Sequence, residues 1–197
     1  MALSFLAVPA LILLLLTSMV ILLNLDWEVN LLALAVQYLG VFYFTAQSWP
    51  FGMAAVKLLV GWMAAAALAM TMIGQQKTEN ESLSFVGRLF PFLAGCLAII
   101  LVFSFAPQAV QWFPANTSLF MVESGLILMM MGLLQLGITG QPLRVILGLL
   151  TMIAGFEILY ASVEVSILVT GLLAAVNLGL ALVGAYLITS STTESGQ

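Results

Sequence analysis

The chain has 197 residues, of which 63% are hydrophobic and only 6% are charged, and its formal net charge at pH 7 is −4. Soluble domains carry about 25% charged residues, so this composition excludes that class and indicates an integral membrane protein. With no histidine and one cysteine, the chain lacks the usual ligand sets for haem, zinc and iron–sulfur clusters, and we expect neither a cofactor nor a bound metal.

Apolar runs of about 20 residues, the length that a helix needs to cross a bilayer, recur along the chain. The first run lacks the basic start and the cleavage site of a signal peptide, so we interpret it as a retained helix. No run alternates as the strands of a membrane barrel do. The sequence therefore predicts an all-α integral membrane protein with a bundle of about seven transmembrane helices, at 3–24, 29–46, 51–74, 86–106, 118–138, 143–161 and 165–190.

A proline-containing loop at 107–117 divides these segments into two groups. We expect a four-helix part at 1–106, a three-helix part at 118–190 and a short disordered tail at 191–197. Small residues, which let membrane helices approach closely, cluster in the third and seventh segments. They are Ala64 to Ala67 in the third segment, and Gly171, Ala174, Ala175, Gly179 and Gly184 in the seventh.

The few cations predict the orientation, because short loops rich in lysine and arginine stay in the cytoplasm. Lys77, Arg88 and Arg144 lie in or beside loops that are two crossings apart, and therefore share one side. We expect the N-terminus outside, the C-terminus in the cytoplasm, and the protein in the cell inner (plasma) membrane. Three tryptophans fall at predicted helix ends, where interfacial anchors are expected: Trp27, Trp49 and Trp112.

Glu157 stands near the far end of an almost unbroken apolar run, 144–160. A charge at membrane depth costs about 2.5–3.5 kcal/mol and is therefore a candidate functional group. Lys57 and Glu123 have a similar predicted depth, in the outer third of the bilayer. These charges can neutralise one another only where their helices pack together. The alternative for Lys57 is that its long side chain extends to the outer interface.

We interpret Glu157, Glu123 and Lys57 as candidates for a proton relay, because carboxylates in apolar surroundings can load and release protons near neutral pH. The same residues could instead join helices structurally. Hydrogen-bonding links between helices are the interpretation for three further polar side chains, Gln37, Gln135 and Asn177.

Residues 119–190 carry a pattern of three apolar segments. The first ends before a short turn with an arginine, the second contains Gly155-Phe156-Glu157-Ile158, and the third is rich in small residues and ends in GLALVGAYL. This pattern resembles the small NuoK-like protein of complex I, the NuoK-like end of a larger membrane protein of hydrogenase-4-type complexes, and the NuoK-like component of Mrp antiporters. The extra N-terminal segments look more like the larger hydrogenase-4 protein.

The resemblance implies a non-redox membrane subunit that lies beside antiporter-like subunits and contributes to translocation of protons or a monovalent cation, with Glu157 on a lateral proton path. The family's second glutamate has no counterpart, because the matching stretch ends in Asn177. Arg144 is about one helical turn farther from Glu157 than the family's turn cation is from its glutamate. Two alternatives stay open: a structural scaffold subunit of a membrane complex, or a small stand-alone transporter. Catalytic residues and a nucleic-acid partner are not expected, since the chain has no nucleophile–base set and no basic patch.

Overall fold

The computed structural model describes residues 6–73 and 85–195. In this part of the chain every regular element is helical, with seven α-helices and one 3₁₀ helix. The elements are α1 (Ala7–Leu23), α2 (Trp27–Thr45), α3 (Phe51–Ile73), α4 (Phe85–Ala109), η2 (Val110–Trp112), α5 (Leu119–Ile138), α6 (Pro142–Val163) and α7 (Ile167–Ser195).

Within the described residues, six helices, α2 to α7, are long and apolar enough to cross a membrane, and the 17-residue α1 is apolar but shorter. A helix suits this environment because its backbone hydrogen bonds are satisfied inside the segment. The predicted class, a multi-pass helical membrane protein, is confirmed at this level. The orientation and the type of membrane stay predictions, because the length and composition of the helices determine neither. Of the three cations that predict the orientation, Lys77 lies outside the described residues.

Two helices run past their predicted ends. α4 continues through Pro107 to Ala109 and is followed by η2, so the first part of the loop expected at 107–117 is helical. A proline disturbs mainly the turn before it, and membrane helices tolerate this. α7 continues to Ser195, into the stretch where the disordered tail was expected, and residues 196–197 lie outside the description. The hydroxyl of Thr189 donates to the carbonyl oxygen of Ala185, which accommodates a polar side chain on this part of the helix.

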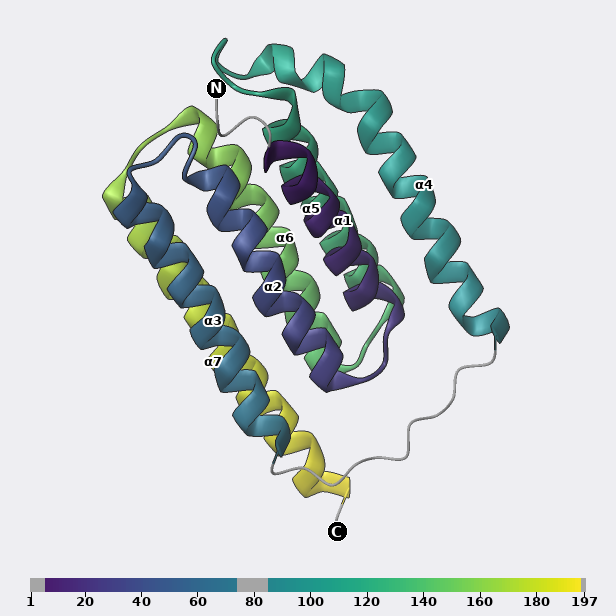
Figure 1. The fold of residues 1–197 in the computed structure, drawn as a ribbon. Coiled ribbons are helices and arrows are strands. Elements are labelled where there is room, and N and C mark those ends of the chain that lie inside the picture. Colours follow the sequence, from purple (N-terminus) through teal and green to yellow (C-terminus); the bar gives the residue numbers. More distant parts are fainter. Residues whose placement is uncertain (1–5, 74–84, 196–197) are drawn as a thin grey trace.

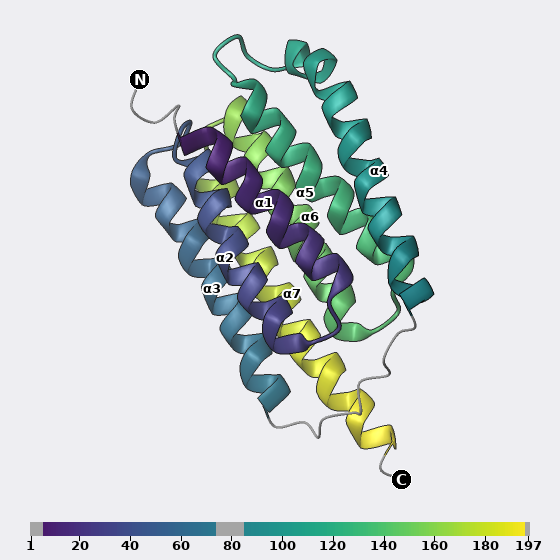
Figure 2. The same cartoon turned by 45° about the vertical axis from the view of Figure 1, so that its right-hand side comes forward.

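Six of the seven described α-helices form two layers of three (Figures 1 and 2). One layer contains α1, α2 and α3, and the other contains α5, α6 and α7. Each helix packs against its counterpart: α1 on α5, α2 on α6 and α3 on α7, while α4 lies at one edge against α5 and α1. The expected four-helix and three-helix parts therefore share one core, because buried residues of both contribute to it.

The closest helix packing lies between α5 and α6. A Cβ atom built on Gly155 would lie 2.5 Å from the carbonyl oxygen of Gly125, and one built on Gly132 would lie 2.6 Å from that of Gly148. Glycines seven residues apart fall on one helix face, so the two helices meet backbone to backbone at two places. This contact fixes the position of α6, which carries Glu157.

The small residues of α7 do less packing than expected. A Cβ atom on Gly171 or Gly179 would meet no atom within 4 Å, so these two glycines allow no close helix approach. Gly184 does pack, because a Cβ atom there would lie 2.8 Å from Ile146 and 3.1 Å from Leu68. Of the glycines in the small-residue cluster of α7, Gly184 therefore lies at a helix contact, and Gly171 and Gly179 do not.

Candidate functional site: a buried lysine–glutamate pair

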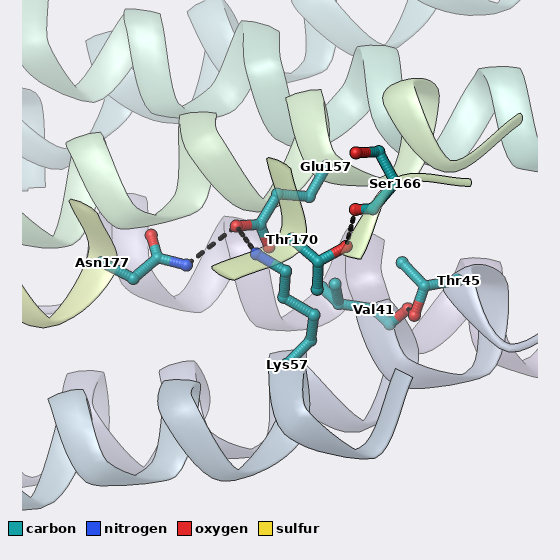
Figure 3. A network of polar contacts seen from close by, with 7 residues as sticks. All are labelled: Val41, Thr45, Lys57, Glu157, Ser166, Thr170 and Asn177. Carbon is teal, nitrogen blue, oxygen red and sulfur yellow. Dashed lines mark hydrogen bonds and ion pairs between the residues drawn. The ribbon is translucent and has the colours of Figure 1, made fainter. Parts of the chain in front are cut away.

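A lysine and a glutamate meet inside the bundle. Lys57 Nζ on α3 lies 2.6 Å from Glu157 Oε1 on α6, and both side chains are 0% exposed (Figure 3). Lys57 belongs to the buried face of α3 together with Ala54, Gly61 and Ala64, at helical spacing. Of the two placements considered for Lys57, the paired one is found, and its side chain does not extend to the surface.

Asn177 on α7 completes the site. Its Nδ2 donates a hydrogen bond of 2.9 Å to the same oxygen, Glu157 Oε1 (Figure 3). Asn177 lies in a narrow buried stripe along α7. Most large apolar side chains on the rest of this helix are exposed. The residue expected to link helices therefore binds the candidate carboxylate itself, and three helices from both layers converge on Glu157.

Two threonines lie between the pair and the end of the bundle where α6 joins α7. Thr45 of α2 and Thr170 of α7 are both buried. Their hydroxyls donate to the carbonyl oxygens of Val41 and Ser166, four residues earlier in the chain (Figure 3). The two hydroxyls make this side of the site polar. Because both already donate to backbone carbonyl oxygens, they do not donate to Glu157.

Trp49 closes the same end of the bundle. Its indole Nε1 donates a hydrogen bond of 2.9 Å to the carbonyl oxygen of Glu164, which joins the α2–α3 connection to the α6–α7 connection. The side chain is only 3% exposed, so the expected interfacial anchor is wrong for Trp49. Trp112, which is 75% exposed, does have the surface position of an anchor.

The two glutamines link helices away from the ion pair. Gln37 Nε2 donates to Thr151 Oγ1 at 3.4 Å and joins α2 to α6. Gln135 Nε2 donates to the carbonyl oxygen of Arg144 at 2.9 Å and joins α5 to α6 near their turn. Both contacts have the kind of role that the sequence indicates for these amides.

Glu123 does not join the pair. Its side chain is 7% exposed, and it has no ion-pair partner among the described residues. The reason is the helix arrangement, since α5 packs mainly against α6, α4 and α1, while α3 lies at the opposite edge over α7. Of the lysine and two carboxylates that the sequence suggested as one group, only Lys57 and Glu157 form an ion pair in the described residues. A role of Glu123 in a proton relay stays a prediction.

Several buried polar atoms, in the site and on the helices beside it, have no hydrogen-bond partner in the described residues. They are Glu157 Oε2, Asn177 Oδ1, Gln37 Oε1 and the hydroxyl of Tyr38, all of them buried. Leaving such a group unpaired costs about 1–3 kcal/mol, and buried polar groups usually have a partner or a bound water. Sequence reasoning missed Tyr38, although its position next to Gln37 in the middle of α2 was a usable signal.

The chemistry available here is proton exchange between an amine and a carboxylate. In the described part of the chain, the acidic and cysteine side chains form no group that could hold a metal ion. Comparison of the chain with protein-family models, with curated proteins and with solved structures finds no match in any of the three.

Proposed function

We propose that this protein is a membrane subunit that carries protons, with Lys57 and Glu157 as the groups that pass them on. The observation that carries the proposal is the 2.6 Å contact between these two fully buried, oppositely charged side chains on membrane helices. Ionisable groups at membrane depth are rare and mark ion pathways in most cases. Asn177 supports the same carboxylate oxygen.

The pair can exist in two forms that have the same net charge. A proton on Lys57 Nζ can move along the existing hydrogen bond to Glu157 Oε1, which breaks an N–H bond, forms an O–H bond and leaves a neutral amine and a neutral acid. A second proton can then bind the amine, and the acid can release the first one to water. Because the transfer within the pair creates no net charge, it avoids the high cost of a lone ion in apolar surroundings.

A proton suits this site better than a metal cation. The ammonium of Lys57 already occupies the carboxylate oxygen at hydrogen-bonding distance. A sodium or potassium ion would have to displace Lys57, and burying a displaced ammonium without a partner would be strongly unfavourable.

The class of partner rests on the resemblance of residues 119–190 to NuoK-like subunits. On that basis the protein is a non-redox subunit of a complex I-like, hydrogenase-4-like or Mrp-like assembly in the plasma membrane, beside antiporter-like subunits. Glu157 would then exchange protons with a neighbouring antiporter-like subunit.

The test uses the full chain, purified with its native partners and reconstituted into liposomes. Glu157→Gln keeps the size of the side chain and removes its proton chemistry, and Glu164→Gln is a matched control at the exposed end of the same helix. We expect Glu157→Gln to abolish proton transfer per assembled complex and Glu164→Gln to leave it unchanged. Normal transfer by a fully assembled Glu157→Gln complex would refute the proposal.

A structural role is the second candidate, favoured by the convergence of α3, α6 and α7 on Glu157. A buried polar network can fix the arrangement of helices without moving protons. On this reading, Glu157→Gln lowers the thermal stability or the yield of the complex, but proton transfer per assembled complex is unchanged. The same reconstitution therefore separates the two functions.

A further inference from the structure

Tyr38 lies against the helix that carries Lys57. Its ring is fully buried and fills the space of a side chain at Gly61 of α3, since a Cβ atom built there would lie 2.2 Å from Tyr38 Cγ. Gly61 is one helical turn after Lys57, on the same buried face of α3. The missing side chain of Gly61 therefore allows the tyrosine ring of α2 to reach the neighbourhood of the ion pair.

The hydroxyl of Tyr38 has no hydrogen-bond partner, and neither does Glu157 Oε2. The first of these groups is a donor and the second is an acceptor. They belong to helices that pack against each other, α2 and α6, and the Tyr38 ring lies against Gly61, one turn from Lys57. Buried tyrosine hydroxyls usually have a hydrogen-bond partner. An unpaired donor and an unpaired acceptor on two packed helices therefore suggest that a single link between them satisfies both.

We infer that Tyr38 is a positioning residue for Glu157. The Tyr38 hydroxyl donates to Glu157 Oε2 through one bridging water, while Lys57 exchanges its proton at Oε1. This inference rests on the proposed function. With Lys57 neutral after the transfer, Oε1 loses the charge that holds it, and a donor on Oε2 keeps the carboxyl group aligned for release of the proton. Tyr38 itself gains and loses no proton in this step.

The first measurement compares Tyr38→Phe with wild type in the reconstituted complex. Tyr186→Phe is the matched control, because Tyr186 is 72% exposed on α7. Losing a hydrogen bond to the carboxyl group should slow proton transfer about tenfold or more. We expect this slowing in Tyr38→Phe, and an unchanged rate in Tyr186→Phe.

The second measurement is the infrared absorption of Glu157, identified as the band that is absent from Glu157→Gln. A donor on Oε2 shifts this band, so Tyr38→Phe should move it and Tyr186→Phe should not. A purely structural role of the ring would leave the band in place, because phenylalanine fills nearly the same volume.

The outcomes separate the inference from the proposed function. If Glu157→Gln abolishes transfer while Tyr38→Phe changes neither rate nor band, the role of Tyr38 is refuted and the relay stands. If Glu157→Gln transfers protons normally, the relay is refuted, and the infrared band still decides whether Tyr38 holds Glu157. A slower rate together with a shifted band supports the inference.

Discussion

Asn177 donates a hydrogen bond to the oxygen of Glu157 that Lys57 also contacts, at 2.9 Å and 2.6 Å respectively. One carboxylate oxygen therefore receives two donors from two helices, α7 and α3, while the other oxygen receives none. This unequal arrangement holds Oε1 in place beside Lys57 and leaves Oε2 able to accept a further donor.

Replacing Asn177 tests how much its hydrogen bond contributes. Asn177→Leu has a similar volume and no donor, so we expect it to destabilise the protein by about 0.6–2 kcal/mol, the range for hydrogen bonds between membrane helices. Asn177→Asp should be more harmful, because it places a second carboxylate beside a pair that has only one cation. Thermal unfolding of the purified variants measures both effects. Equal stability of the Leu and Asp variants would contradict the expected charge conflict.

A double-mutant cycle tests the ion pair. Lys57→Met leaves Glu157 buried without its partner and should cost about 3–5 kcal/mol, whereas Lys57→Met combined with Glu157→Gln should recover part of this loss. The measurement is reversible unfolding in detergent or bicelles for both single variants and the double variant. A double variant whose loss equals the sum of the two single losses would show that the charges do not stabilise each other.

Much of the fold follows from the sequence, because the length and polarity of the apolar runs set the helix positions. The ion pair follows only in part. Lys57 and Glu157 stand out as charges in apolar segments at similar depth, but nothing local says that α3 and α6 approach each other. Glu123 has the same local signal as Glu157, and the layer arrangement alone keeps it away from Lys57.

Close packing was the least predictable feature. Glycines occur in both α5–α6 and α7, and the sequence does not say which of them face a neighbouring helix. The structure places Gly155 at a backbone contact and Gly171 in open space. Tyr38 was missed for a related reason. Its ring packs into the space left by Gly61 on another helix, and the sequence does not show that these two residues meet.

The packing difference predicts opposite effects of one substitution at two sites. Gly155→Ala should destabilise the bundle, because its Cβ atom would lie 2.5 Å from a carbonyl oxygen and 2.7 Å from the backbone nitrogen of Met129, which cannot move as a flexible side chain can. Gly171→Ala should be neutral or stabilising, since alanine favours helix by about 1 kcal/mol and the Cβ atom meets nothing within 4 Å. The melting temperatures of the two variants decide this. A lower value for Gly171→Ala than for Gly155→Ala would contradict the packing.

Trp49 should contribute stability through its indole N–H. Trp49→Phe keeps an aromatic ring but loses the hydrogen bond to the carbonyl oxygen of Glu164, and we expect a loss of about 0.5–1.5 kcal/mol or more, because the carbonyl loses its partner. Trp112→Phe, at a side chain that is 75% exposed, is the control and should change the stability little. Unfolding midpoints of the two variants give the comparison, and equal midpoints would show that the indole hydrogen bond does not hold the two connections together.

Glu123 and Glu157 should behave as independent sites. They share no hydrogen-bond or ion-pair partner in the described residues, and effects at sites without shared partners usually add within about 0.3–0.5 kcal/mol. We therefore expect the stability change of the double variant Glu123→Gln/Glu157→Gln to equal the sum of the two single changes, in contrast to the strong coupling of Lys57 with Glu157. The same three variants, measured for proton transfer, test the relay role predicted for Glu123. Slower proton transfer in Glu123→Gln, together with additive stability changes, would place Glu123 on the proton path but outside the ion pair. Unchanged transfer would remove Glu123 from the path and leave Glu157 as the acidic group that exchanges protons with Lys57.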